Sequence, residues 1–143
     1  MSEPETRSVR AAVVPGRRSR VGLALIAVLL VGLGLLGRFA LPGAAGDVAG
    51  GLLYAALVYV LVAIVAPDAS VGRLAVVALA VVLGIELLQL TGLPAAIGEA
   101  FAPARLVLGT TFTASDLVVG AVGVGLMAAT DRVLAGPRHR PTR

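Results

Sequence analysis

The fold class of this chain is decided by VAGGLLYAALVYVLVAIVA (Val48–Ala66), a continuous apolar stretch without a charged residue. A helix needs about 20 apolar residues to cross a hydrocarbon core about 30 Å thick, and this stretch is long enough. Similar stretches cover residues 21–41, 74–90 and 112–134. They are too long for strands and lack alternation of apolar and polar residues, so we predict four membrane-spanning helices.

The overall composition supports a membrane protein. Of the 143 residues, 58% are hydrophobic and 14% are charged, and the mean hydropathy is +0.98. A soluble domain carries about a quarter charged residues. We therefore expect an all-α integral membrane four-helix bundle at residues 21–134, between a polar basic tail (1–20) and a second basic tail (135–143). Between the third and fourth spans, Pro94–Phe101 is expected to form a short interfacial or re-entrant helix.

The distribution of arginine predicts the topology. Five arginines precede the first span, and four lie between Arg132, at the end of the last span, and residue 143. Because basic segments stay inside, we expect a multi-pass protein of the inner (plasma) membrane with both termini in the cytoplasm. The alternative is a cleaved signal peptide ending near Gly43-Ala44-Ala45, but the polar region before the apolar run is long for one. The arginines flank apolar runs, so the lipid bilayer is an expected partner and nucleic acid is not.

Cysteine is absent, and the single histidine, His139, lies in the C-terminal tail. This composition argues against disulfides, a thiolate nucleophile and a His-based triad. We expect neither a cofactor nor a metal site.

The predicted topology places several polar residues in the outer leaflet or at its surface. Glu86 and Gln89 are three apart and share a helix face, and Asp116 lies at a similar depth near the start of the last span. Ionisable residues within a membrane are functional candidates by default. Arg105 is expected to approach a carboxylate. The candidate polar pocket comprises Arg38, Asp47, Tyr54, Glu86, Gln89, Arg105 and Asp116. The alternative for each is structural, as interhelical hydrogen bonding or, for Arg38 and Asp47, as a turn anchor.

Small residues recur at four-residue spacing in three of the spans. Such stripes allow helix backbones to approach closely in lipid. We expect them to pack within the monomer, in preference to forming a dimer interface. They are Gly51, Ala55, Tyr59 and Ala63 in the second span, Ala80 and Gly84 in the third, and Ala121, Gly125 and Ala129 in the fourth.

The order of these motifs resembles a known family. The motifs are Arg38, GDVAGGLLYAALVY (Gly46–Tyr59), IELLQL (Ile85–Leu90), Arg105 and LGTTFTASDLVVGAVG (Leu108–Gly123). From about Arg38 to Gly125 the chain resembles the small bacterial four-helix membrane proteins classed as domain of unknown function 2809. It departs from the usual family pattern at Leu88, where serine is typical. It is more loosely similar to VanZ-like proteins of the bacterial cell envelope. The resemblance implies a four-helix membrane fold and a shared set of polar residues, but it implies no established chemistry.

Three functions compete at this stage. The favoured one is non-enzymatic: an outer-leaflet pocket that binds an envelope amphiphile, such as a lipid head group or cell-wall intermediate, or a partner membrane protein. The alternative is an enzyme that acts on a lipid-linked substrate at the extracytoplasmic face, with Glu86 or Asp116 as general base. Ion or proton movement ranks lowest, because no acidic residue continues inward from Glu86. Binding predicts that Glu-to-Gln exchange is tolerated, whereas catalysis predicts that Glu86→Gln abolishes activity.

Overall fold

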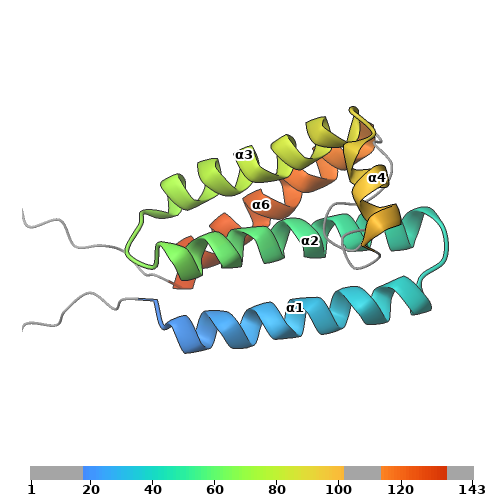
Figure 1. The fold of residues 1–143 in the computed structure, drawn as a ribbon. Helices are drawn as coiled ribbons and strands as arrows, with labels where there is room; N and C mark the ends of the chain where they lie inside the picture. The colour runs from blue at the N-terminus through green and yellow to red at the C-terminus, as the bar shows by residue number, and fades with distance from the viewer. Residues whose placement is uncertain (1–17, 102–113, 135–143) are drawn as a thin grey trace, which may run out of the picture.

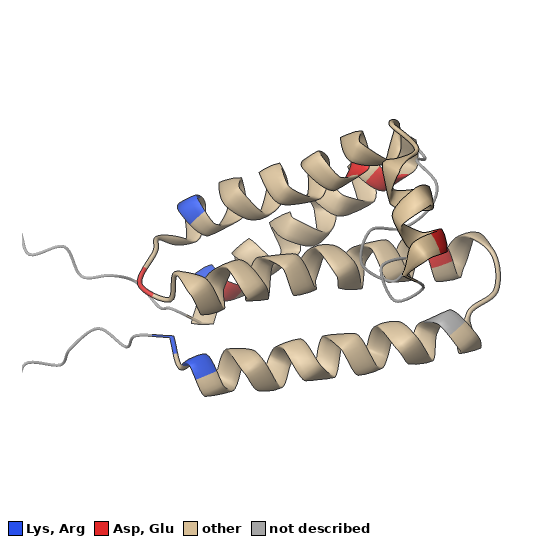
Figure 2. Ribbon diagram, in the orientation of Figure 1, with Lys and Arg blue, Asp and Glu red and all other residues tan. Residues whose placement is uncertain are grey.

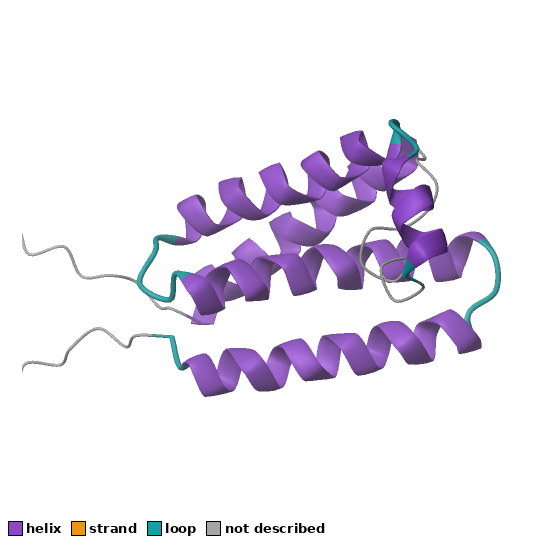
Figure 3. Cartoon of the chain, in the orientation of Figure 1, coloured by secondary structure: helices purple, strands orange, loops and turns teal. Residues whose placement is uncertain are grey.

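The computed structural model describes residues 18–101 and 114–134, apart from the side chain of Arg38. Within these ranges the chain is helical with short loops (Figures 1 and 3). The helices are α1 (Arg20–Ala40), α2 (Ala44–Val65), α3 (Val71–Gln89), α4 (Leu93–Ala100) and α6 (Ala114–Leu134). Four of them, α1, α2, α3 and α6, are long and apolar enough to cross a membrane. The predicted all-α four-helix membrane bundle is confirmed.

Helix α2 is the centre of the bundle. It packs against α1, α3 and α6, and α3 also packs against α6 (Figure 1). The buried core lies among α2, α3 and α6 and contains Ala55, Val58, Tyr59, Ala63, Leu74, Ala78, Val82 and Val124. None of the apolar window of α1 is buried. The fold is therefore a three-helix core with α1 packed along one side of α2.

Glycines on α6 allow the core helices to pack closely. A Cβ atom added to Gly123 would lie 2.7 Å from Ala55 Cβ and 3.0 Å from the carbonyl oxygen of Leu52, both on α2. A Cβ atom added to Gly120 would lie 2.7 Å from Val82 Cγ1 on α3. Real side chains do not approach this closely. Since lipid provides no hydrophobic drive for helix association, this close backbone packing is a main source of its stability.

The predicted small-residue stripes are right for α2 and wrong for α3 and α6. On α2, Ala55, Tyr59 and Ala63 are almost fully buried. The predicted residues of α3 and α6 are exposed: Ala80, Gly84, Ala121, Gly125 and Ala129. The reason is that small residues occupy more than one face of each helix, and spacing alone does not identify the face that packs. The buried face of α6 instead contains Gly120, Gly123 and Val124.

The loops at the α4 end depend on two glycines with positive φ. Gly43 (φ 63) and Gly92 (φ 71) adopt a conformation that other residues rarely take. Helix α2 begins right after Gly43, so it starts earlier than Val48, where the second apolar stretch of the sequence begins. Asp47 lies in the first turn of α2, where its carboxylate is favourably placed relative to the helix dipole. The short helix expected between the third and fourth spans is present as α4, with proline in its first turn.

Candidate functional site

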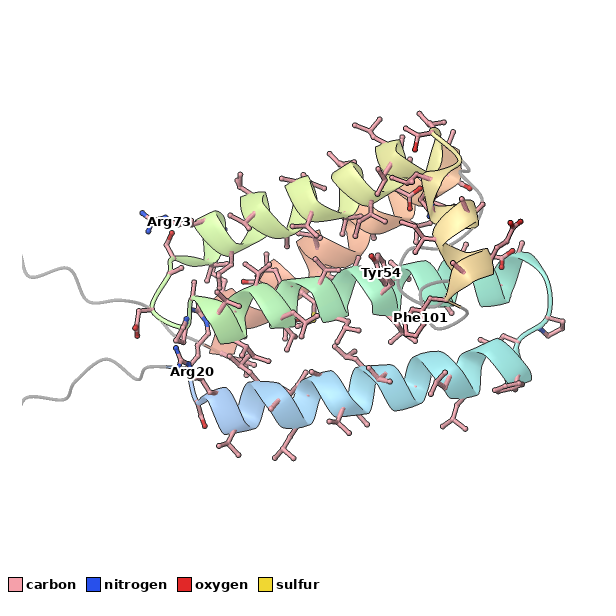
Figure 4. All side chains as sticks on the ribbon, viewed as in Figure 1. Arg20, Tyr54, Arg73 and Phe101 are labelled. Carbon is pink, nitrogen blue, oxygen red and sulfur yellow. The ribbon has the colours of Figure 1, made fainter. Side chains whose placement is uncertain are left out.

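The described charged residues are distributed unequally between the two ends of the bundle (Figure 2). We call the end where α1 begins and α6 ends the basic end; it carries Arg18, Arg20, Arg73 and Arg132 together with Asp68 and Asp131. Arg73 extends away from the bundle there (Figure 4). We call the opposite end, where α3 leads into α4, the acidic end. Its described charged residues are Asp47, Glu86, Glu99 and Asp116.

Glu86 is the central residue of the acidic end. It lies in the last turns of α3, and its relative exposure is 8%, which makes it the buried charged residue of the described chain. Its Oε2 atom is buried and has no hydrogen-bond partner among the described residues. A buried carboxylate is costly unless it is paired and hydrogen-bonded. Apolar packing therefore does not explain why the Glu86 side chain is buried.

Two side chains from other helices accompany Glu86. Tyr54 on α2 and Asp116 near the start of α6 both interact electrostatically with it. The Tyr54 hydroxyl is buried and, like Glu86 Oε2, has no hydrogen-bond partner among the described residues. Figure 4 labels Tyr54 on the part of α2 that faces the end carrying α4. Tyr54, Glu86 and Asp116 thus come from the three core helices at one end of the bundle, within electrostatic range of Glu86, and we call these residues the acidic cluster.

The other residues of the predicted pocket have different positions. Gln89 is half-buried, one turn beyond Glu86 on the same face of α3. Asp47 is exposed and lines a hollow of about 180 Å³ at the α1–α2 turn, together with Phe39, Leu41, Pro42, Gly43 and Gly46. Arg105 and the side chain of Arg38 lie outside the described part of the structure. The expected approach of Arg105 to a carboxylate therefore stays a prediction.

The basic end contains a polar cluster that the sequence analysis missed. The Arg18 guanidinium binds Asp131 in a bidentate manner: Nε donates to Oδ1 at 2.9 Å, and Nη2 lies 2.9 Å from Oδ2. Arg18 Nη1 also donates to the carbonyl oxygens of Pro67 (2.9 Å) and Ala69 (2.8 Å) in the α2–α3 loop. The Tyr59 hydroxyl donates to Asp131 Oδ2 at 2.6 Å. We call Arg18, Tyr59 and Asp131 the basic-end clasp.

The clasp escaped notice because each member had another interpretation. Arg18 lies in the expected N-terminal tail, Asp131 lies in the last turn of the expected fourth span, and Tyr59 belongs to a predicted packing stripe. One signal was available: Asp131 ends the apolar part of the fourth span, at the same membrane face as the arginines that precede the first span. An acidic residue in that position has cations within reach, and a tyrosine inside the second span could complete the group.

An apolar layer separates the acidic cluster from the clasp. Ala55 and Val58, which lie between Tyr54 and Tyr59 on α2, form one buried cluster with Ala78 and Val82 of α3, and all four are at most 7% exposed. Gly120 and Gly123 of α6 close this layer from the third side. The layer carries no ionisable group in the described residues, which argues against a path for ions or protons between the two ends.

The fold and the polar groups define a class: a small multi-pass α-helical membrane protein with an acidic cluster at one end. Comparison with known proteins identifies the family. A family model described as "Protein of unknown function (DUF2809)" matches residues 40–124, more than half of the chain, so the chain belongs to this family. The match covers α2, α3, α4 and the first half of α6, and α1 lies outside it apart from its last residue. No curated protein and no solved structure matches the chain.

Proposed function

We propose that this protein is a non-enzymatic binding protein of the bacterial plasma membrane, whose acidic cluster receives the polar head of an envelope amphiphile. The observation that carries the proposal is the buried Glu86 carboxylate, whose Oε2 atom has no hydrogen-bond partner among the described residues. A ligand that donates hydrogen bonds to Glu86 would offset the cost of burying it. The Tyr54 hydroxyl at the same end supports the same conclusion, because it too is buried and has no hydrogen-bond partner among the described residues.

The position of the cluster favours an amphiphile over a water-soluble ligand. Glu86 lies near the end of a membrane-spanning helix, close to the depth where lipid head groups meet acyl chains. Helix α4 packs against α3 and turns back across this end of the bundle (Figure 1). An amphiphile could reach the cluster laterally from the bilayer and keep its chains in lipid. In the predicted pocket, Arg38 and Arg105 would meet an anionic part of the ligand, and Asp47 and Gln89 would help orient it.

The proposed orientation places the acidic cluster at the outer face. Both described ends of the chain lie at the basic end (Figure 1), and the sequences that precede and follow them are rich in arginine. Basic segments remain on the cytoplasmic side of the membrane. With the basic end in the cytoplasm, the acidic cluster faces the outside, where cell-envelope intermediates and outer-leaflet lipids are available.

The alternative function is acid–base catalysis on a lipid-linked substrate. It is favoured by one observation, the electrostatic interaction of two carboxylates, Glu86 and Asp116, within one site. The sequence supplies no cysteine, and its one histidine is in the C-terminal tail, so a covalent route through either residue type is not supported. If the protein is an enzyme, the Glu86→Gln variant should be purified with unconverted substrate bound, whereas wild type should be purified with product bound.

The test is the identity of lipids that stay with the full chain when it is purified from its native membrane. Native mass spectrometry should detect a bound amphiphile on wild type. Glu86→Leu should lose it, because leucine offers no hydrogen-bond acceptor. Glu99→Leu is the matched control: it removes a glutamate carboxylate from the same end of the bundle, at an exposed position outside the proposed pocket. Equal retention by both variants, or no bound amphiphile on wild type, would contradict the proposal.

A further inference from the structure

The basic-end clasp shows how this fold stabilises a carboxylate beside a tyrosine. Asp131 accepts a hydrogen bond from the Tyr59 hydroxyl and forms a bidentate ion pair with Arg18, and the side chains of the ion pair are each 15% exposed. Every strong acceptor of Asp131 is therefore paired with a donor, and its negative charge is balanced. Such pairing is the condition under which a carboxylate remains charged away from water.

In the described part of the chain, the acidic cluster has the same kinds of side chain as the clasp but no balancing positive charge. It contains a tyrosine from α2 and a carboxylate from α6, and Glu86 adds a second, more deeply buried carboxylate from α3. Among the described residues, the positive side chains are all at the basic end, on the far side of the apolar layer (Figure 2). The two carboxylates repel each other, and a cation between them would reverse this unfavourable interaction.

We propose that the head group bound at the acidic cluster carries a protonated amine. This inference rests on the proposed function and specifies its ligand. An ammonium group has three donors and no acceptor. It can donate to Glu86 Oε2, to the Asp116 carboxylate and to the Tyr54 oxygen, which are contributed by three different helices. The described residues contain no group of three or more His, Cys, Asp or Glu that could hold a metal ion, so a metal is a poorer match than an ammonium group.

The inference discriminates among common head groups. A primary ammonium, as in phosphatidylethanolamine, supplies both positive charge and donors. A quaternary ammonium, as in phosphatidylcholine, supplies charge without donors. Phosphatidylglycerol supplies hydroxyl donors and only negative charge, which the two carboxylates repel. The expected order of retention is therefore ethanolamine, then choline, then glycerol head groups.

The experiment uses the full chain in nanodiscs made from equal amounts of these three lipids with identical acyl chains, and counts retained lipids by native mass spectrometry. Wild type should retain phosphatidylethanolamine roughly tenfold over phosphatidylglycerol, the ratio expected for one charge-assisted interaction of about 1.4 kcal/mol. Glu86→Gln keeps the shape and a hydrogen-bond acceptor but removes the charge, and it should abolish the preference. Glu99→Gln makes the same exchange at an exposed position of the same end, outside the proposed pocket, and should preserve the preference.

The outcomes separate this inference from the proposed function. If Glu86→Gln behaves as wild type while Glu86→Leu loses lipid, the head-group site stands and the ammonium inference is overturned. If neither wild type nor any variant retains a head group selectively, and free ethanolamine does not stabilise wild type, both are overturned. Retention of phosphatidylglycerol at or above the level of phosphatidylethanolamine also overturns the inference.

Two further arms identify the source of the amine. Adding free ethanolamine to wild type in amine-free detergent should raise the unfolding temperature, and Glu86→Gln should show no such rise. A rise with ethanolamine but no lipid selectivity would support a soluble amine as the source. Arg105→Gln tests whether the chain supplies its own cation. If Arg105→Gln destabilises wild type but not Glu86→Gln, the Arg105 guanidinium is the partner of Glu86, and an external amine is excluded.

Discussion

Replacing Arg18 by alanine should destabilise the protein more than any other exchange of a described arginine. Arg18 precedes α1, yet its guanidinium contacts Asp131 at the end of α6 and two carbonyl oxygens of the α2–α3 loop. Since the paired side chains are each only 15% exposed, removing Arg18 leaves the Asp131 charge largely buried with Tyr59 as its remaining donor. Breaking a buried pair costs about 3–5 kcal/mol, and we expect a loss of stability near that range.

The matched control is Arg20→Ala, two residues away. It removes the same charge and a similar side chain at the same end of the bundle, but Arg20 is exposed. Exposed substitutions usually change stability by about 0.5 kcal/mol or less. Unfolding of the purified protein should be followed in mixed micelles with increasing denaturing detergent, using circular dichroism. Tyr59→Phe should cost about 1.5–3 kcal/mol, the value for one hydrogen bond to a charged group.

A double-mutant cycle shows whether the clasp acts as a unit. Arg18→Ala and Asp131→Ala together should cost less than the sum of the single variants, because the first removal already disrupts the pair; the difference should be about 0.5–3 kcal/mol. Strict additivity would mean that the two side chains do not interact in the folded protein. Equal stability of Arg18→Ala and Arg20→Ala would refute the reasoning from burial and bidentate geometry.

Two further predictions concern packing and topology. Gly123→Val should destabilise the bundle by about 1–3 kcal/mol, because its Cβ would collide with Ala55 and the Leu52 carbonyl. Gly125→Val is the control and should be neutral, because the space around Gly125 is open. Equal loss of stability in the two variants would contradict the α2–α6 packing. Single cysteines in either tail should react with an impermeant maleimide only after the cells are broken, because the basic end is proposed to be cytoplasmic; labelling of intact cells would overturn that orientation.

The fold was predictable because its decisive signals are local. Length and apolar composition define each span without knowledge of its neighbours, and the prolines and glycines that interrupt the runs define the connections. The family resemblance rested on short motifs around Gly46–Tyr59 and Ile85–Leu90, and the family match covers both. Even here one boundary was misplaced: the apolar stretch begins at Val48, whereas Gly43 turns the chain and lets α2 begin at Ala44.

The polar groups were less predictable because their roles depend on which helix faces meet. The spacing of Glu86 and Gln89 shows that they share a face, but only the packing of α3 against α2 and α6 brings Glu86 to Tyr54 and Asp116. Arg18 and Asp131 are separated by 113 positions, and no local pattern connects them. The sequence alone does not show that Arg18 neutralises the Asp131 carboxylate at the basic end.

This difference between the two ends is the strongest reason to place function at the acidic end. At the basic end, Asp131 is bound by residues of the chain itself, so its burial is explained by structure alone. At the acidic end, Glu86 is more deeply buried than Asp131 and lies beside a second carboxylate. If Glu86 served only to connect helices, an amide or hydroxyl would do so at lower cost in lipid. A buried carboxylic acid at this position therefore supports the proposed partner that recognises charge.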